Sequence, residues 1–300
     1  MSQLIIFCSA IFINLVFIYF IYPFLKNNIV AIPNKRSSHK KNIPTAGGIS
    51  FVIIGTILSC FYNFWHPLLI LPLAIVGLID DCIYVKAKTK YIFQIITSAL
   101  LIYFYKDFHI IFENFNLILI LIFSILILIA LTGLINLVNF MDGLDGLVTS
   151  CCLIIFVCIS ITSNLQLIPI AGCLFAFLIY NWFPAKLFMG DIGSTFLGCI
   201  LGIVILNSSS LLILTSRILL ISPFLADAAI CILRRFFAKD AIFRPHKLHL
   251  FQRLHQAGFR HDQISLLYIL STLLLSIFYY FENFRLLLIF SILIIFIGIL

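Results

Sequence analysis

Six aspartates lie in or beside strongly apolar segments of this chain, where a carboxylate is costly and needs a reason. They are Asp80, Asp81, Asp142, Asp145, Asp191 and Asp227. A charge at membrane depth is expensive unless it faces protein, water or a cation, and such residues are functional-site candidates by default. Oxygen ligands gathered in this way are suited to holding a hard cation such as Mg²⁺.

The segment from Asn139 to Leu147 contains two of these acids. Asp142 and Asp145 are three residues apart, which on a helix would place both on one face, with Asn139 one turn earlier. Glycines beside them permit the close approach of a ligand or an irregular turn. The main rival interpretation is the polar lining of a pore.

A second acidic motif, Asp80-Asp81, closes an apolar segment and is followed by Lys86, Lys88 and Lys90. Adjacent carboxylates repel each other, so a divalent cation or a lysine is expected to neutralise them. They also fit poorly at a helix C-terminus, where the helix dipole disfavours negative charge. The alternative is an ordinary solvated helix end.

The third acidic motif is Asp191, flanked by Gly190 and Gly193. Glycines allow sharp turns that present a carboxylate to a metal ion, although Gly-Asp turns are common without that role.

Two basic segments accompany the acids. Lys40 and Lys41 precede a Pro-Thr-Ala-Gly-Gly stretch ending at Gly48, where backbone N–H groups at a helix start suit a phosphate. Near the other end, His246, His249 and Arg253 belong to a segment rich in basic side chains and imidazoles, which suits anions. Plain topology signals, or an amphipathic surface segment on anionic lipid headgroups, are the alternatives. Together, these loops have the groups that a Mg²⁺-dependent or Mn²⁺-dependent reaction on a diphosphate requires.

The elements that must position these residues are membrane-spanning helices. The chain has 300 residues, of which 63% are hydrophobic and only 10% charged. We therefore expect an all-α polytopic membrane protein with one domain over residues 1–300. The expected spans number eleven, with ten as the alternative, and lie near 3–24, 47–64, 67–79, 91–105, 117–138, 148–163, 167–180, 195–207, 211–232, 264–281 and 286–300.

Loop charge predicts the orientation. Most of the lysines and arginines fall in alternate loops, which the positive-inside rule places in the cytoplasm together with the six aspartates. The N-terminus then lies outside, and the first apolar segment is a retained span.

Because the net charge of +8 is spread over these loops, nucleic acid is not expected as a partner. The nine cysteines lack metal or redox spacing and are expected to be packing residues. Arg217, inside the expected span 211–232, has no evident role.

Together, the motifs resemble those of the polyprenyl-phosphate N-acetylhexosamine-1-phosphate transferases, the superfamily of MraY-like and WecA-like enzymes. The matching segments are Pro44–Gly48, Asp80-Asp81 with Lys88, Lys90 and Gln94, Asn139–Gly146, and Met189–Ser194, all in family order. The resemblance implies an integral enzyme of the bacterial cytoplasmic (inner) membrane. It would use Mg²⁺ to transfer a sugar 1-phosphate from a UDP-sugar to undecaprenyl phosphate, with a homodimer as an option.

Residue roles follow from the same resemblance. Asp191 matches the magnesium ligand, and Asp80 and Asp81 match the acidic pair assigned to metal binding or lipid-phosphate activation. Catalysis is thus expected from Asp80, Asp81, Asp191 and His249. Substrate contacts are expected from Lys40, Lys41, Lys88, Lys90, Asn139, Asp142, Asp145, His246 and Arg253.

Two departures affect the expected donor. Tyr84 stands where WecA-like members carry a third carboxylate, and His249 is followed two residues later by Phe251 instead of a second histidine. These features look closer to WbpL-like enzymes that begin O-antigen chains, which favours UDP-N-acetylated amino or deoxy sugars over UDP-GlcNAc alone. A transporter or flippase with an acid-lined path, or a scaffold with a basic face, are the alternatives from other classes.

Overall fold

The computed structural model of the chain describes residues 2–33, 41–105, 110–113, 115–237, 239 and 249–299. Its helices are α1 (Gln3–Asn28), α2 (Ile49–Phe61), α3 (Leu71–Cys82), α4 (Ala87–Phe104), α6 (Leu117–Met141), α7 (Leu147–Thr162), α8 (Ile168–Asn181), α9 (Gly190–Leu206), α10 (Leu211–Leu220), α11 (Ser222–Phe237), α12 (Leu250–Gln256), α13 (His261–Tyr280) and α14 (Phe284–Ile299). A short 3₁₀ turn, η1, covers His66–Ile70.

The helices form because the segments are apolar, and capping side chains and prolines set where several of them begin. In hydrocarbon every backbone polar group must be satisfied within the protein, which selects helices for such apolar segments. The side chains of Ser2, Asn116 and Ser210 accept backbone N–H groups at the starts of α1, α6 and α10. Pro72 and Pro169 occupy the first turns of α3 and α8, where proline costs no hydrogen bond.

The all-α expectation is confirmed for the described residues, and each expected span coincides with one helix or with a pair of helices. By length and composition, three of the described helices can cross a membrane, namely α1, α6 and α13, and the α10–α11 pair passes when taken together. Helices α2, α7, α8, α9 and α14 are apolar but shorter. The number of eleven crossings therefore stays a prediction.

Two expected spans differ in detail from the structure. The segment 211–232 is two helices, α10 and α11, bent by 74°. The segment 195–207 begins earlier, at Gly190, so that Asp191 lies in the first turn of α9. The glycine-containing stretch that reads as a loop is helical because α9 begins against the end of α3.

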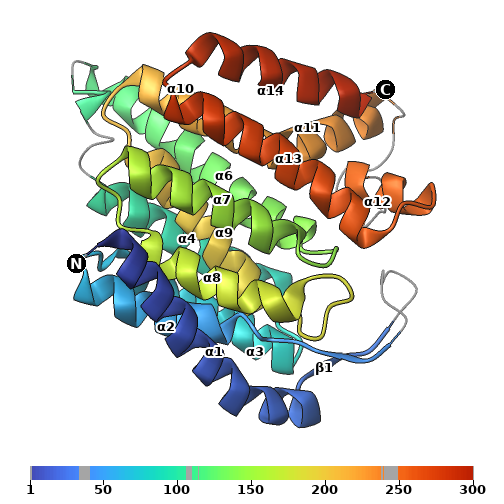
Figure 1. Ribbon diagram of the computed structural model, residues 1–300. Helices are drawn as coiled ribbons and strands as arrows, with labels where there is room; N and C mark the ends of the chain where they lie inside the picture. The colour runs from blue at the N-terminus through green and yellow to red at the C-terminus, as the bar shows by residue number, and fades with distance from the viewer. Residues whose placement is uncertain are drawn as a thin grey trace.

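Helix α9 is the centre of the packing. Almost all of its residues are buried, and it contacts α3, α6 and α2 (Figure 1). The buried hydrophobic side chains form one cluster, in which α9 contributes Phe196, Leu197, Ile200 and Val204. A side chain at the start of α9 is therefore held by helices that are far apart in sequence.

A small hairpin was not expected from the sequence. Strand β1 (Val30–Ala31) pairs antiparallel with β2 (Ile43–Pro44), with Val30 opposite Pro44. The hairpin lies at the end of α1, beside the edge of the molecule where α12 is also found (Figure 1).

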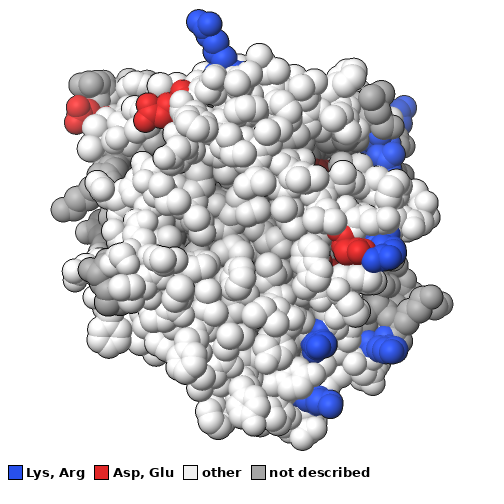
Figure 2. Space-filling model, in the orientation of Figure 1, with Lys and Arg blue, Asp and Glu red and all other residues white. Residues whose placement is uncertain are grey.

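Charged side chains gather at two opposite edges of the visible face (Figure 2). Most of the visible lysines and arginines lie along the edge that carries α12, where an acidic side chain also lies, and acidic side chains with a basic one mark the upper part of the opposite side, with a broad uncharged surface between them. The two chain ends also lie on opposite sides (Figure 1). This distribution is typical of a molecule that crosses a membrane with one basic face.

Arg217 has a clear position in the structure. It lies in α10, is 3% exposed, and donates from Nη1 to the backbone oxygens of Val204, at 3.0 Å, and Asn207. Its Nε donates to the hydroxyl of Tyr279 at 3.2 Å. The guanidinium thus caps the C-terminus of α9, where the carbonyls lack helical partners and the dipole favours a cation.

Candidate active site

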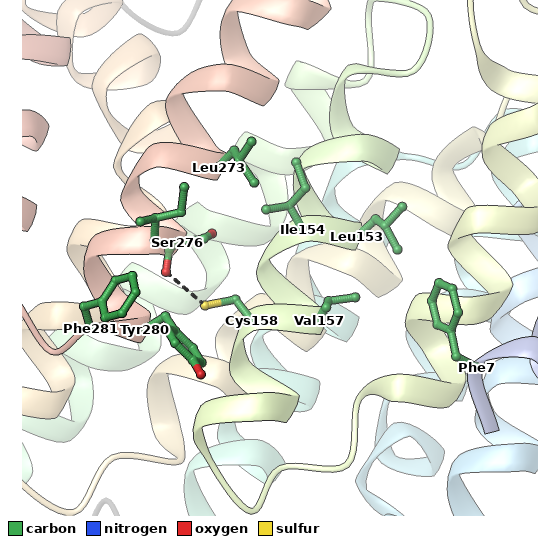
Figure 3. Close-up of a pocket in the computed structure, with 10 residues that line it drawn as sticks. Phe7, Leu153, Ile154, Val157, Cys158, Leu273, Ser276, Tyr280 and Phe281 are labelled. Atoms are coloured by element: carbon green, nitrogen blue, oxygen red, sulfur yellow. Dashed lines mark hydrogen bonds between the residues drawn. The ribbon is translucent and has the colours of Figure 1, made fainter. Parts of the chain in front are cut away.

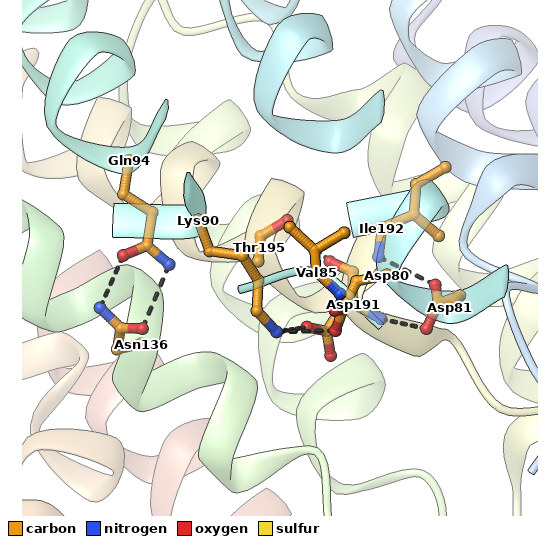
Figure 4. A network of polar contacts seen from close by, with 9 residues as sticks. All are labelled: Asp80, Asp81, Val85, Lys90, Gln94, Asn136, Asp191, Ile192 and Thr195. Carbon is orange, nitrogen blue, oxygen red and sulfur yellow. Dashed lines mark hydrogen bonds and ion pairs between the residues drawn. The ribbon is translucent and has the colours of Figure 1, made fainter. Parts of the chain in front are cut away.

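Three charged side chains from three helices meet in one polar network (Figure 4). The Lys90 ammonium on α4 donates to Asp80 Oδ2 at 2.7 Å, on the last turn of α3, and to Asp191 Oδ2 at 2.8 Å, on the first turn of α9. The three side chains are 17% to 28% exposed. A lysine thus neutralises two carboxylates that are 111 positions apart in sequence, as the Asp80-Asp81 motif predicted for the first of them.

Asp81 has a different environment from its neighbour. Its Oδ1 accepts the backbone N–H of Asp191 at 2.9 Å, and its Oδ2 accepts that of Ile192 at 3.2 Å. These are unpaired donors at the N-terminus of α9, where the dipole favours a negative charge. The unfavourable placement of Asp81 at the end of α3 is therefore offset by its favourable placement at the start of α9.

Two glycines permit this junction. A Cβ atom on Gly190, which has φ of +72°, would lie 2.3 Å from Asp81 Oδ2. A Cβ atom on Gly77 would lie 2.7 Å from the backbone of Asp191. Only residues without a side chain allow α3 and α9 to approach this closely.

Helix α4 is fixed in turn by α6. The side-chain amides of Gln94 and Asn136 exchange two hydrogen bonds, at 3.1 and 2.8 Å, one turn along α4 from Lys90 (Figure 4). This reciprocal pair sets the rotation of α4 and hence the direction in which Lys90 points. Asn136 was not recognised in the sequence, because an amide in an apolar helix has no distinctive spacing.

The expectation that backbone N–H groups at Gly47 and Gly48 bind a phosphate was wrong. They donate to the carbonyl oxygens of Phe188 and Met189, both at 2.9 Å, while Phe188 N–H donates to Pro44 at 2.9 Å. The Pro44–Gly48 segment instead braces the residues immediately before Asp191.

The Asn139–Leu147 segment is not one continuous helix. Helix α6 ends at Met141, Asp142 is its C-cap, and α7 begins at Leu147 after Gly146, which has φ of +73°. The arrangement of Asp142 and Asp145 on one face was expected only for a helix, and it does not apply here because α6 ends at Met141.

Asp142 and Asp145 lie in different surroundings. Desolvation raises the pKa of Asp142 well above its usual value, and the carboxylates of Asp191, Asp81 and Asp145 raise it further. Asp145 is 7% exposed and accepts the backbone N–H of Ala185 at 2.9 Å. Asp142 thus belongs electrostatically to the Asp191 group, whereas Asp145 holds the loop between α8 and α9.

Asp145 also faces the start of α13. Its Oδ1 lies 3.1 Å from His261 Nδ1, and its backbone oxygen accepts the hydroxyl of Ser265 at 2.9 Å. His261 was not recognised in the sequence, because nothing near it indicates a partner more than a hundred residues away.

His249 is held by a buried acid. Its Nδ1 lies 3.1 Å from Oδ1 of Asp227, which is 1% exposed on α11. The imidazole stacks on Phe251 and lies 6.3 Å from the ring of Phe140, measured between centroids. Asp227 appeared in the sequence as a lone acid in an apolar segment, without an assigned role.

A cleft of about 1000 Å³ opens beside Asp145. Its lining includes Lys26, Lys41, Lys186, His255, Arg260 and His261, with the aromatic ring of Phe183 among them. Arg260 lies over the Phe183 ring at 5.6 Å from its centroid. The cleft is therefore basic, with flat rings in its wall, and suits an anionic ligand with a planar group.

The remaining expected site residues are distributed as follows. Lys88 is exposed in the first turn of α4, Asn139 is partly buried in the last turn of α6, and Arg253 is partly buried on α12. Lys40 and His246 lie outside the described residues.

A second cavity, of about 360 Å³, has no such chemistry (Figure 3). It lies between α7, α13 and Phe7 of α1, and nearly all of its lining is apolar. The thiol of Cys158 donates to the Ser276 backbone oxygen at 3.4 Å inside it. No carboxylate, amine or imidazole lines it, so the polar group around Asp191 is the candidate active site.

The donor set around Asp191 fits a magnesium ion. Among the described residues, no three His, Cys, Asp or Glu side chains form a ready-made metal cage. Asp80 and Asp191 nevertheless place two carboxylates around one cationic group, Lys90. Magnesium needs only one or two protein carboxylates, because water and substrate phosphates complete its shell.

Comparison with known proteins gives consistent matches. Residues 63–209 match the model of the glycosyl transferase family 4. The chain is 28% identical over 280 residues to a probable undecaprenyl-phosphate N-acetylglucosaminyl 1-phosphate transferase of Bacillus subtilis, covering 84% of this chain and 78% of the relative. It is 30% identical over 246 residues to the phospho-N-acetylmuramoyl-pentapeptide-transferase of Staphylococcus epidermidis, covering 70% and 76%.

Proposed function

Because the chain belongs to the polyprenyl-phosphate N-acetylhexosamine-1-phosphate transferase superfamily, we propose that it transfers an N-acetylhexosamine-type sugar 1-phosphate from a UDP-sugar to undecaprenyl phosphate. UMP is the second product. The membership confirms the resemblance seen in the motifs. The observation that carries the proposal is the convergence of Asp80, Lys90 and Asp191, because two carboxylates and a lysine suit a metal-assisted reaction of phosphates.

In this reaction an oxygen of the lipid phosphate attacks the β-phosphorus of the UDP-sugar. The new P–O bond joins the two phosphates, and the bond between the β-phosphorus and the bridging oxygen breaks. The electron pair leaves with UMP. Little covalent chemistry falls to the protein, so positioning and charge stabilisation are its main tasks.

We assign Asp191 and Asp80 to magnesium binding. Bound there, magnesium would offset the negative charge of the diphosphate. Lys90 is 2.7 to 2.8 Å from both carboxylates, so it can move from them to a phosphate oxygen when substrate binds. Lys88, exposed two residues before Lys90 in the first turn of α4, adds positive charge at the same end of the helix.

Asp81 is better suited to positioning than to proton transfer. Both of its oxygens accept N–H groups of α9, so the carboxylate holds Asp191 in place. Asp80 accepts the Val85 N–H at Oδ1, at 2.7 Å, and the Lys90 ammonium at Oδ2. Because a phosphate can draw Lys90 away, Asp80 is our choice for any base role. That role is small, because a phosphate with a second pKa of about 6 is already mostly dianionic at neutral pH.

The basic cleft is our proposed binding site for the UDP-sugar donor. Lys41 and Asp145, both expected substrate contacts, line it together with Lys186 and Arg260. The Asn139–Asp145 turn connects this cleft to the Asp191 group, because Asp142 lies near Asp191 and Asp145 in the cleft wall. A nucleotide-sugar that lies along the turn would bring its diphosphate to Asp191.

We further propose that the basic edge faces the cytoplasm of a bacterium and that the product begins an O-antigen-type glycan. The gathering of basic side chains at one edge supports the orientation. The motif style around Asn139 and His249 supports an N-acetylated amino or deoxy sugar over UDP-GlcNAc alone.

The test is turnover by purified protein with undecaprenyl phosphate, Mg²⁺ and a panel of UDP-N-acetylhexosamine donors. We expect lipid-linked product with at least one donor, loss of turnover with EDTA, and recovery with excess Mg²⁺ or Mn²⁺. Absence of product with every donor, under conditions where a related transferase is active, would refute the proposal.

A further inference from the structure

Asp227 is a buried acid to which the reaction above assigns no task. It lies on α11 at 1% exposure, and donors from two other parts of the chain, the start of α12 and α13, surround it. Oδ1 receives His249 Nδ1 at 3.1 Å and Leu250 N–H at 2.7 Å. Oδ2 receives the Tyr268 hydroxyl at 2.7 Å and Phe251 N–H at 3.5 Å.

Part of this arrangement is structural. The N–H groups of Leu250 and Phe251 are the first donors of α12, and a carboxylate satisfies such groups well. Tyr268 ties the same carboxylate to α13. His249 is itself the N-cap residue of α12, and it forms a capping box with Gln252, whose side-chain oxygen accepts the His249 N–H at 3.3 Å.

The contact with His249 has a chemical consequence. A carboxylate only accepts hydrogen bonds, so Nδ1 of His249 must carry the proton between the two groups. The other ring nitrogen, Nε2, is then the atom through which the ring can meet a substrate. Two aromatic rings lie close to the imidazole, with Phe251 stacked at 5.7 Å and Phe140 tilted at 6.3 Å between centroids.

The position of the imidazole matters because of what lies nearby. Phe140 belongs to the last turn of α6, two residues before Asp142, a carboxyl group that interacts electrostatically with Asp191. A Cβ atom on Gly143 would lie 3.1 Å from the Phe251 ring, so the start of α12 packs directly on the Asn139–Asp145 turn. The imidazole therefore lies beside the place proposed for the diphosphate.

We propose that Asp227 is a positioning residue for the transferase reaction. It orients the His249 imidazole through Nδ1 and serves as its counter-ion, so that Nε2–H can bond to a phosphate oxygen of the donor. Such charge-assisted bonds to phosphate are stronger than neutral ones. The inference rests on the function proposed above and adds one residue to its machinery.

The experiment is a double-mutant cycle between Asp227 and His249. Asp227→Ala, His249→Ala and the double variant are assayed for kcat and for KM of the donor and of undecaprenyl phosphate. With His249 present, Asp227→Ala is expected to lower kcat by about 10- to 100-fold, which is typical for residues that orient a ligating or reacting group. In the His249→Ala background the same change is expected to alter kcat by less than about 2-fold.

Thermal unfolding separates positioning from loss of the α12 cap. Asp227→Ala is expected to lower the unfolding midpoint in both backgrounds, because Leu250, Phe251 and Tyr268 lose their acceptor in each, whereas its effect on kcat is expected only where His249 is present. If Asp227→Ala does not yield folded protein, Asp227→Asn replaces it, because the amide keeps the size of the side chain and one acceptor oxygen while it removes the charge and places an NH2 group where the second acceptor was. It is expected to lower kcat with unchanged donor KM when His249 is present, and to have no effect on kcat without it.

The outcomes are distinguishable. An equal loss of kcat in both backgrounds, with an active wild type, would overturn the positioning role and leave the proposed function intact. A wild-type protein without turnover would overturn both.

Discussion

At the scale of single residues, some acids of the site hold the backbone in place, and others are available to a metal ion or a substrate. Asp81 gives both oxygens to the backbone of α9, and Asp145 holds Ala185 and faces His261. Asp80 and Asp191 share the Lys90 ammonium, which a metal ion or a phosphate can replace. Adjacent acids of one motif thus have different tasks because their partners differ.

Asp191→Asn is expected to abolish turnover, with kcat reduced at least about 100-fold, because an amide cannot supply the anionic oxygen that Mg²⁺ prefers. Folding should be retained, since the backbone N–H of Asp191, which bonds to Asp81, is unchanged. The measurements are UMP release and thermal unfolding. Glu113→Gln, an exposed acid far from α9 in sequence, is the control and should keep full activity. Near-normal turnover in Asp191→Asn would remove this residue from the metal site.

The acids were visible in the sequence because a carboxylate in an apolar context is unusual. Their partners were not. Asp80 and Asp81 have different roles because the first contacts α4 and the second contacts α9. Which helix each carboxylate contacts depends on how α3 is rotated, and the sequence does not give that rotation. The phosphate role of Gly47 and Gly48 was wrong for a similar reason, since their N–H groups meet a loop 140 residues away.

At the scale of elements, the site depends on the hydrogen bonds that hold α9 at both of its ends. At its N-terminus Asp81 accepts two backbone N–H groups, and at its C-terminus Arg217 donates to the carbonyls of Val204 and Asn207. Acid at the start and base at the end both match the helix dipole. Because α9 carries Asp191, these contacts set the position of the proposed metal ligand.

Gly190→Ala tests the contact between Asp81 and the N-terminus of α9. The new Cβ would lie 2.3 Å from Asp81 Oδ2, and the φ of +72° is unfavourable for alanine by about 1–2 kcal/mol. We expect a lower unfolding midpoint and a kcat reduced by 10-fold or more, on the order of the cost of a small misplacement in an active site. Gly133→Ala, with nothing within 4 Å of its Cβ in α6, should leave both quantities unchanged or raise stability slightly. Equal behaviour of the two variants would contradict the close approach of α3 and α9.

Arg217→Met tests the cap that Arg217 forms at the C-terminus of α9. The variant leaves carbonyls at the end of α9 without their cationic donor, which should lower the free energy of unfolding by about 1.5–3 kcal/mol. Thermal unfolding in detergent is the measurement. Arg285→Met removes an exposed arginine from α14 and should have little effect. An unchanged midpoint in Arg217→Met would show that α9 does not depend on this cap.

Helix positions were predictable because long apolar runs have few alternatives to helix in a membrane. The exceptions occur where tertiary contacts decide. Helix α9 begins five residues before its expected span because Asp81 supplies a cap, and α10 and α11 separate at Ile221 although the apolar run continues. Arg217 could not be placed from the sequence, since its acceptors are backbone oxygens and not a recognisable acid.

At the scale of the whole molecule, charge is sorted to opposite edges, with an uncharged surface between them (Figure 2). A transporter or flippase with an acid-lined path would place charges near mid-depth. In the described part of the chain, the buried cation Arg217 caps a helix, and the acids around Lys90 lie at one edge. The arrangement favours an enzyme that acts at one membrane face.

The proposed orientation predicts thiol accessibility. Cys82, exposed just after Asp81, should face the cytoplasm, whereas Cys60 at the far end of α2 should face outside. A membrane-impermeant maleimide should label Cys82 only in inverted vesicles and Cys60 only in intact cells, as shown by loss of label in Cys82→Ser and Cys60→Ser respectively. Labelling of Cys82 in intact cells would reverse the orientation.

The most direct test of the central claim is the identity of the released nucleotide and the fate of the β-phosphorus. A UDP-N-acetylhexosamine labelled at that phosphorus is incubated with the protein, undecaprenyl phosphate and Mg²⁺, and the aqueous and lipid products are separated. Sugar-1-phosphate transfer predicts UMP in the aqueous phase and the label in the lipid. Release of UDP that retains the label would mean that the sugar alone is transferred, and it would contradict the account.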